Sequence, residues 1–140
     1  IPDDYYTIEI GKAKVVNEGE DLTIVTYGLG VHWAKEYANN HSDQSIEIID
    51  LRTLLPLDTE TIYDSVKKTG RVVVLHEDCL TGGIGGEIVA LIAENCFQYL
   101  DAPVKRVASL DTPIPFAIDL EQQFLPKTRL DEAIDAIMQF

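Results

Sequence analysis

The alternation of strand-like and helix-like segments constrains the fold of this chain more than any other feature of its sequence. Runs rich in β-branched and apolar residues, which are typical of strands, are separated by segments with apolar residues at helical spacing. The strand-like runs are Leu22–Tyr27, Ile46–Leu51, Arg71–Leu75 and Val104–Leu110. The helix-like segments are Val31–Asn39, Thr59–Thr69, Glu87–Leu100 and Leu130–Phe140. This order predicts an α/β fold, a three-layer α/β/α sandwich around a mostly parallel sheet.

Local signals fix several of the expected ends. Asp58 is a good N-cap for the second helix, and Gly70 follows its last residue. The run from Val72 to Leu75 is apolar at every position, as expected of a central strand that is covered on both faces. Two prolines in the segment Asp111–Pro115 predict an extended loop there.

Length and charge exclude several classes of protein. The chain has 140 residues, which is the size of one domain. Its 24 Asp and Glu residues outnumber 11 Lys and Arg residues, so a net charge of −13 repels nucleic acids and favours a basic protein partner. The apolar runs are much shorter than the ~20 residues of a membrane helix. We therefore expect neither nucleic-acid binding nor membrane insertion.

The chain ends and the cysteines give weaker indications. The N-terminus has no signal-peptide pattern and no initiator methionine, so we expect a segment excised from a longer protein. Cys79 and Cys96 match no metal-ligand spacing and make a poor disulfide framework. We expect buried free thiols, no metal site and a cytoplasmic location.

The first strand-to-helix turn resembles a dinucleotide-binding fingerprint. Gly28 and Gly30 have the spacing of its first two glycines, and Asp50 ends the next strand. Trp33 occupies the place of the third glycine, where the helix must approach the strand closely. A tight structural turn is the favoured interpretation, and a nucleotide-binding oxidoreductase domain is the alternative.

The second glycine-rich turn precedes the longest predicted helix. Gly82, Gly83, Gly85 and Gly86 could hold an anion at a helix N-terminus, but the turn lacks the lysine of a phosphate-binding loop and is followed by Glu87. Close packing against another subunit is at least as good an explanation. His76 ends the preceding strand, where ligands bind in open α/β sheets, and is the one candidate catalytic residue. A hydrogen-bonded structural histidine or a subunit contact is the alternative role for it.

Several runs of residues resemble the C-terminal domain of the β chain of 2-oxo acid dehydrogenases. In that family, the β chain is part of the thiamine-dependent decarboxylating component of the complexes. The runs are Ile48–Pro56, His76-Glu77 with Leu80–Gly83, Ala102–Val104 with Arg106-Val107, and Asp111–Pro113. The resemblance covers nearly the whole chain, and the motif Glu94-x-Cys96-Phe97 favours the branched-chain (2-oxoisovalerate) type over the pyruvate type.

The resemblance implies a transketolase C-terminal-type domain with a five-stranded sheet. We expect residues 1–20 to be a linker and residues 21–140 to be the domain. In the family, thiamine diphosphate and magnesium lie between the α chain and the preceding domain of the β chain. The segment alone is therefore expected to bind no cofactor and to be inactive, although its parent enzyme decarboxylates a branched 2-oxo acid and transfers the acyl group to a lipoyl arm.

The resemblance also implies partners. They are the α chain, a second β chain, and the basic subunit-binding domain of the dihydrolipoyl acyltransferase. Asp101 and the carboxylate of Phe140 are the residues expected to contact the acyltransferase. Gly82, Gly83, Gly85 and Gly86 are assigned to subunit packing. A further alternative is the C-terminal domain of a transketolase-type enzyme that acts on sugar phosphates.

Overall fold

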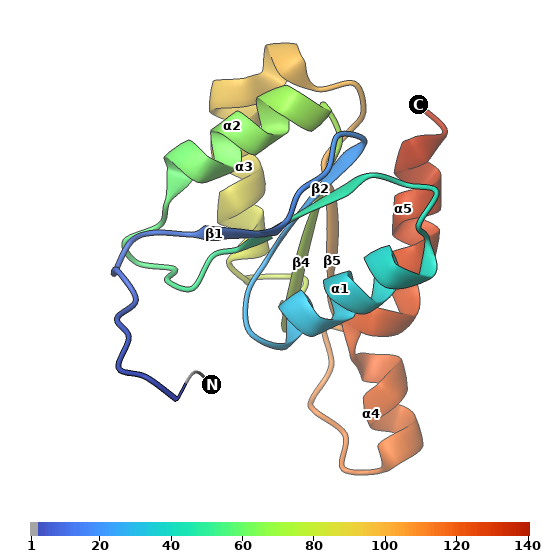
Figure 1. Ribbon diagram of the computed structural model, residues 1–140. Coiled ribbons are helices and arrows are strands. Elements are labelled where there is room, and N and C mark those ends of the chain that lie inside the picture. The colour runs from blue at the N-terminus through green and yellow to red at the C-terminus, as the bar shows by residue number, and fades with distance from the viewer. Residues whose placement is uncertain (1–2) are drawn as a thin grey trace.

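A computed structural model describes residues 3–140 (Figure 1). The five strands are β1 (Lys14–Asn17), β2 (Leu22–Thr26), β3 (Ile46–Asp50), β4 (Val72–Cys79) and β5 (Lys105–Ser109). The α-helices are α1 (Leu29–Asn40), α2 (Thr59–Thr69), α3 (Gly85–Cys96), α4 (Ile118–Phe124) and α5 (Leu130–Met138). Two short 3-10 helices, η1 (Phe97–Tyr99) and η2 (Pro126–Arg129), follow α3 and α4. None of the helices in this part of the chain has the length and apolar character needed to cross a bilayer.

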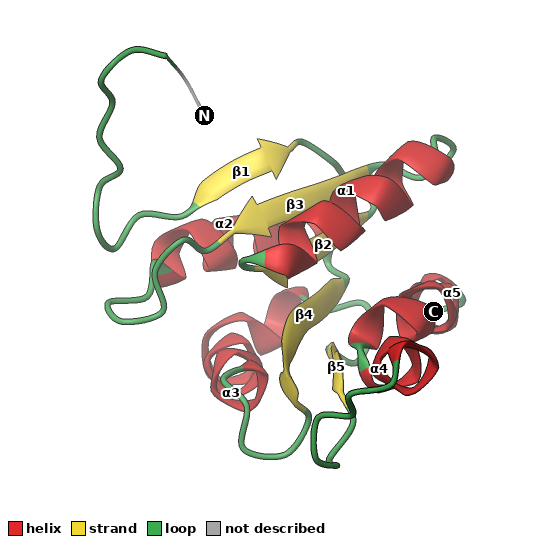
Figure 2. Cartoon of the chain, turned by 90° about the horizontal axis from the view of Figure 1, so that it is seen from below, coloured by secondary structure: helices red, strands yellow, loops and turns green. Residues whose placement is uncertain are grey.

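The strands form one sheet in the order β1-β3-β2-β4-β5. Strands β2 to β5 are parallel to one another, and β1 pairs antiparallel with β3 at one edge. Helices α1 and α5 cover one face of the sheet, and α2 and α3 cover the other (Figure 2). The predicted three-layer sandwich with a mostly parallel five-stranded sheet is confirmed.

Each face of the sheet has its own apolar core. On one face Trp33 and Tyr37 of α1 and Ile134 of α5 pack against residues such as Ile24 and Leu75. On the other face Ile62 and Val66 of α2 and Ile88 and Ile92 of α3 pack against Val74. Strand β2 and the first part of strand β4 are fully buried because helices cover both faces of the sheet there.

The structure differs from the sequence-based expectation at four places. Strand β1 lies within residues 1–20, so the sheet starts before the expected domain boundary at residue 21. It has four residues, is only half buried and contains a bulge, which explains why no alternation is visible in the sequence. Helix α4 follows the predicted loop, β4 continues to Cys79, and the helix predicted to reach Leu100 ends at Cys96, where η1 begins.

The caps predicted for α2 are confirmed. The Asp58 side chain accepts hydrogen bonds from the Thr61 amide at 3.3 Å and the Thr61 hydroxyl at 2.9 Å. Its second partner is the Ala13 amide at 2.9 Å, which ties the segment before β1 to the start of α2. These hydrogen bonds, against the effect of burial, hold the pKa of Asp58 below its usual value. Gly70 ends the helix in the left-handed conformation, with φ of 67°.

A buried polar network joins α2 to the sheet. Glu47 of β3 is 2% exposed and accepts hydrogen bonds from Ser65 and Lys68 of α2. Thr23 of β2 lies within 2.7 Å of the hydroxyls of both Ser65 and Thr69. Burial by itself would raise the pKa of Glu47, but Lys68 and Ser65 outweigh it and lower the pKa below the ordinary glutamate value.

We predict that Glu47→Gln lowers the free energy of unfolding by about 1–3 kcal/mol at pH 7, because Lys68 loses its buried partner. The folded pKa of Glu47 lies below the unfolded value, so its contribution is present above the unfolded pKa and is lost as pH falls through the folded pKa. The difference from the parent chain in urea unfolding should therefore shrink below about pH 4. Glu18→Gln is the matched control, since exposed Glu18 pairs with the same Lys68 at 3.4 Å and should contribute less than about 0.5 kcal/mol. Equal losses in the two variants would contradict the role of the buried network.

Candidate functional site

The carboxyl ends of β2 and β4 form the switch point of the sheet, because α1 leaves β2 on one face and α3 leaves β4 on the other. A crevice of about 370 Å³ lies at this place. Its polar lining is Tyr27, Glu77, Asp78, Cys79 and Glu121, and its apolar lining is Ile114, Phe124 and Leu125. Burial, and then the carboxylates of Asp78 and Glu77, raise the pKa of Tyr27, so its hydroxyl remains protonated at neutral pH.

His76 does not enter this crevice. Its side chain is fully buried on the opposite face from Leu75, and its ring nitrogens have no hydrogen-bond partner within residues 3–140. Burial lowers the pKa of His76. The charge of Asp78 raises this pKa by a smaller amount, and the charge of Arg106 lowers it further. The imidazole is therefore neutral at pH 7 and has no path to a substrate in this part of the chain. The geometry gives no support to His76 as a catalytic residue, and the hydrogen-bonded alternative is also not observed.

The second glycine-rich turn packs on His76. A Cβ atom at Gly85 would overlap the His76 ring, and one at Gly83 would lie 2.6 Å from its Cε1 atom. Gly82 has φ of 81° and, like Gly86, has room for a side chain. Gly82, Gly83 and Gly85 thus have an explanation within the chain, because the positive φ of Gly82 also favours glycine, and the assignment of the turn to subunit packing stays a prediction. Asp111 holds the turn by accepting hydrogen bonds from the Thr81 amide at 2.8 Å and the Thr81 hydroxyl at 2.6 Å.

The first glycine turn has a structural role. Gly28 has φ of 57°, and a Cβ atom at Gly30 would overlap Thr26. Trp33 is buried in the core between α1 and the sheet, where the fingerprint has its third glycine. The Asp50 carboxylate accepts a hydrogen bond from the Arg52 amide at 3.2 Å. These contacts agree with the favoured interpretation of a tight turn rather than a dinucleotide site.

Exposed apolar side chains gather where the parallel strands end. Loops after β2, β3, β4 and β5 carry them, and Phe116 is fully exposed. We call this set the carboxyl-end surface: Leu29, Leu55, Leu80, Leu110, Ile114, Phe116, Ile118 and Leu120. Large apolar side chains exposed at one end of a domain are typical of a surface that a partner covers, so this end has the character of an interface.

The N-terminal segment meets the same end of the domain. Strand β1 runs antiparallel to β3, so Lys14 at its start pairs with Asp50 at the end of β3. Before β1, the Gly11 amide donates to the Thr53 hydroxyl at 3.0 Å in the loop that follows β3. Figure 1 shows this segment and α4 at the same end, away from the C-terminus. The segment itself exposes Tyr5, Tyr6, Ile8 and Ile10.

Asp101 and Phe140 lie at the opposite end of the sheet. Asp101 follows η1, and its amide donates to the Gly70 carbonyl at 2.8 Å, so its carboxyl group packs on the end of α2. Phe140 follows α5 and is exposed, as are Phe97 and Tyr99 of η1. Within residues 3–140 no hydrogen bond or ion pair joins Asp101 to Phe140.

The cysteines and acidic residues form no metal centre in the described part of the chain. No group of three or more His, Cys, Asp and Glu side chains there has the geometry to hold a metal ion. Cys79 and Cys96 are both free thiols; Cys96 is buried and Cys79 is half buried. Sequence patterns did not single out Tyr27 and Phe124 of the crevice or the apolar residues of the carboxyl-end surface.

We predict that Gly85→Ala lowers the free energy of unfolding by about 1–3 kcal/mol, because the new methyl group overlaps the buried His76 ring. Gly86→Ala is the matched control, since the next residue of α3 has only the Arg106 Nη1 atom nearby, at 3.7 Å. That variant should be neutral or up to about 1 kcal/mol more stable, because alanine favours helix over glycine. Urea midpoints would measure both changes. Equal stability of the two variants would show that the turn does not pack on His76.

Comparison with known proteins identifies the domain. The family model described as "Transketolase, C-terminal domain" matches residues 11–129. A solved structure titled "Split gene transketolase, inactive beta4 tetramer" has a TM-score of 0.75 and 27% identity, covering 99% of this chain and 44% of the other.

Curated relatives have two different substrates in their names. The pyruvate dehydrogenase E1 component subunit beta of Rickettsia bellii is 49% identical over 121 residues, which cover 85% of this chain and 37% of the relative. The 2-oxoisovalerate dehydrogenase subunit beta of Pseudomonas aeruginosa is also 49% identical, over 117 residues that cover 84% and 33%. The preference for the branched-chain type is therefore not confirmed.

The chain thus spans about a third of the length of these two relatives, 37% and 33%. The family match covers most of the chain, and the observed sheet order and layers agree with it. The chain belongs to the transketolase C-terminal domain family.

Proposed function

We propose that this chain is the C-terminal domain of the β subunit of a thiamine-dependent 2-oxo acid dehydrogenase and serves to assemble that enzyme. The observation that carries the proposal is the carboxyl-end surface, which is apolar and lies where the N-terminal segment leaves the domain. Relatives at 49% identity, named as β subunits of two such dehydrogenases, support the enzyme class. The parent reaction is oxidative decarboxylation of a 2-oxo acid with acyl transfer to a lipoyl group.

The carboxyl-end surface suits association with the rest of the β subunit, the α chain and a second β chain. Its apolar residues lie in the segments that follow four different strands, so one partner can cover all of them only by approaching along the direction of the strands. Burying side chains such as Phe116 and Leu55, which are almost fully exposed, would stabilise an assembly by the hydrophobic effect. The loop Asp111–Ala117 is held at its base by the Asp111–Thr81 hydrogen bonds, so the surface is partly preorganised.

The residues of this chain do not fit thiamine diphosphate. The glycine turn before α3 is filled by His76, and Glu87 in the first turn of the helix would repel a diphosphate. The carboxylates of Glu77 and Asp78 lie at the same end of the domain and add negative charge there. We therefore propose that the cofactor and its metal bind elsewhere in the parent enzyme, and we assign no catalytic step to this domain.

The opposite end of the domain is proposed to dock the acyltransferase. Exposed Phe97, Tyr99 and Phe140 provide apolar contacts, and Asp101 supplies a carboxylate held against Gly70. The net charge of −13 would speed the approach of a basic subunit-binding domain.

Two finer assignments are also proposals. The motif Glu94-x-Cys96-Phe97 supports the branched-chain type, and the two free thiols support a reducing, cytoplasmic location. Activity of the complete enzyme toward 2-oxoisovalerate, compared with pyruvate, would decide the substrate. A transketolase-type enzyme is the second candidate, favoured by the similarity to the split-gene transketolase, although identity to it is only 27%.

We predict that this chain can replace the matched third of the Pseudomonas aeruginosa β subunit. The chimeric subunit, produced with its α chain, should form a heterotetramer and turn over 2-oxo acids. Phe116→Asp in the chimera should weaken assembly by about tenfold or more, because a carboxylate replaces an apolar interface side chain. Light scattering would measure assembly, and the rate of 2-oxo acid turnover should fall together with the assembled fraction.

Phe97→Asp is the matched control at the other end of the domain. It should leave the heterotetramer intact and weaken acyltransferase binding instead. A folded chimera that does not associate, or equal effects of the two substitutions on assembly, would contradict the proposal.

A further inference from the structure

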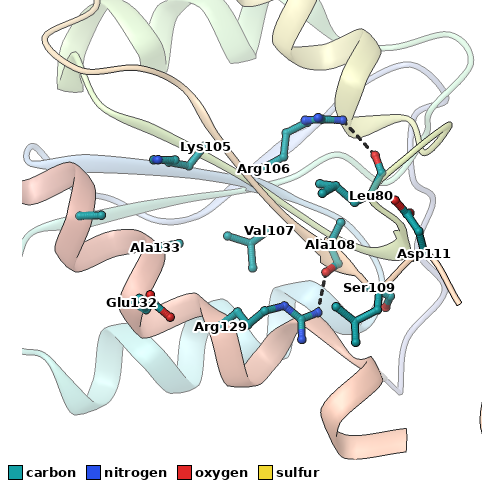
Figure 3. A pocket seen from close by; sticks show the side chains of 12 residues that line it. Leu80, Lys105, Arg106, Val107, Ala108, Ser109, Asp111, Arg129, Glu132 and Ala133 are labelled. Atoms are coloured by element: carbon teal, nitrogen blue, oxygen red, sulfur yellow. Dashed lines mark hydrogen bonds between the residues drawn. The ribbon is translucent and has the colours of Figure 1, made fainter.

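The sheet has one edge that borders an apolar groove. Strand β5 is paired with β4 on one side only, and a groove of about 440 Å³ runs between its free side and α5 (Figure 3). Small residues of α5, Ala133 and Ala136, leave the space, and Val107 and Ala108 form its floor. The other edge strand, β1, begins with exposed Lys14, and exposed Lys12 lies just before it.

The free side of β5 offers backbone hydrogen-bonding groups. Ser109 directs its carbonyl toward the β4 side, where it accepts from the Leu80 amide at 3.0 Å. Ala108 directs its carbonyl away from β4, where Arg129 donates to it at 2.7 Å. Because successive residues of a strand direct their peptide groups to opposite sides, Arg106 also presents its amide and carbonyl to the groove.

The groove carries positive charge in a chain that is strongly acidic. Lys105, Arg106 and Arg129 line it, three of only 11 basic residues. Within residues 3–140, none of the three lies within 4.0 Å of a carboxylate. The guanidinium groups instead donate to carbonyl oxygens, Arg106 to Leu80 at 2.9 Å and Arg129 to Gln123, Ala108 and Phe124. Of the two acids in the lining, Asp111 is already engaged by Thr81.

We propose that this groove docks an extended segment of a partner protein that alternates apolar and acidic residues. The backbone of the segment pairs with the exposed start of β5 at Arg106, its apolar side chains fill the space beside Ala133 and Ala136, and its carboxylates meet Lys105 and Arg106. Strand β5 of a second copy contains two cations and no carboxylate, so it does not complement the charge of the groove. This docking site shares Leu80 and Leu110 with the carboxyl-end surface, but it does not depend on the proposed function.

The test uses the isotope-labelled 140-residue chain and two hexapeptides. One alternates valine and glutamate and the other alternates valine and lysine. The glutamate peptide should shift the amide resonances of residues 105–109 and 133–136 and bind at least about tenfold more tightly than the lysine peptide. Lys105→Glu/Arg106→Glu should reduce its binding by about tenfold or more, whereas Lys12→Glu/Lys14→Glu, the same charge change at the β1 edge, should leave it unchanged.

Three outcomes would overturn the proposal. They are equal binding of the two peptides, shifts outside the groove, and no shift up to about 5 mM peptide. The last outcome would mean that Lys105 and Arg106 only protect an exposed strand edge from pairing. Dispersed amide spectra of both double variants would exclude unfolding as the cause of lost binding.

Discussion

Burial of the same strands on both faces is the constraint on which the rest of the structure depends. Val73 and Leu75 contribute to the core under α1 and α5, and Val72 and Val74 contribute to the core under α2 and α3. Crossover helices that connect parallel strands can cover both faces of a sheet, as α1 and α5 on one face and α2 and α3 on the other do here. Four parallel strands therefore end together, and this brings the loops of the carboxyl-end surface to one end of the domain.

Most of this architecture could be predicted from the sequence because its signals are local. The apolar run at Val72–Leu75, the Asp58 cap and the Gly70 stop each depend on a few neighbouring residues, and each was confirmed. Strand β1 was missed because its four residues are stabilised by pairing with β3, 30 residues away or more, rather than by their own pattern. Helix α4 was not predicted because Phe124 is its one buried side chain, so its sequence has no row of apolar residues at helical spacing that packs on the core.

The candidate site was less predictable, since it depends on contacts between distant segments. Nothing near His76 in the sequence shows that Gly83 and Gly85 close over its ring, or that both its nitrogens are buried. In the same way, exposed Leu55 and Phe116 are ordinary loop residues until the fold brings their loops to one end. The end of the sheet at which Asp101 lies also follows from topology, because η1 precedes β5.

Hydrogen exchange would test the central claim, that the carboxyl-end surface holds the domain in its parent enzyme. Amide exchange rates would be compared between the isolated 140-residue chain and the same domain in the assembled chimera. Slower exchange in the assembly at residues 51–58 and 110–120, with little change at residues 97–101, is the expected result. Unchanged exchange in those two loops, with protection confined to the end that carries Asp101, would contradict the proposed orientation of the domain.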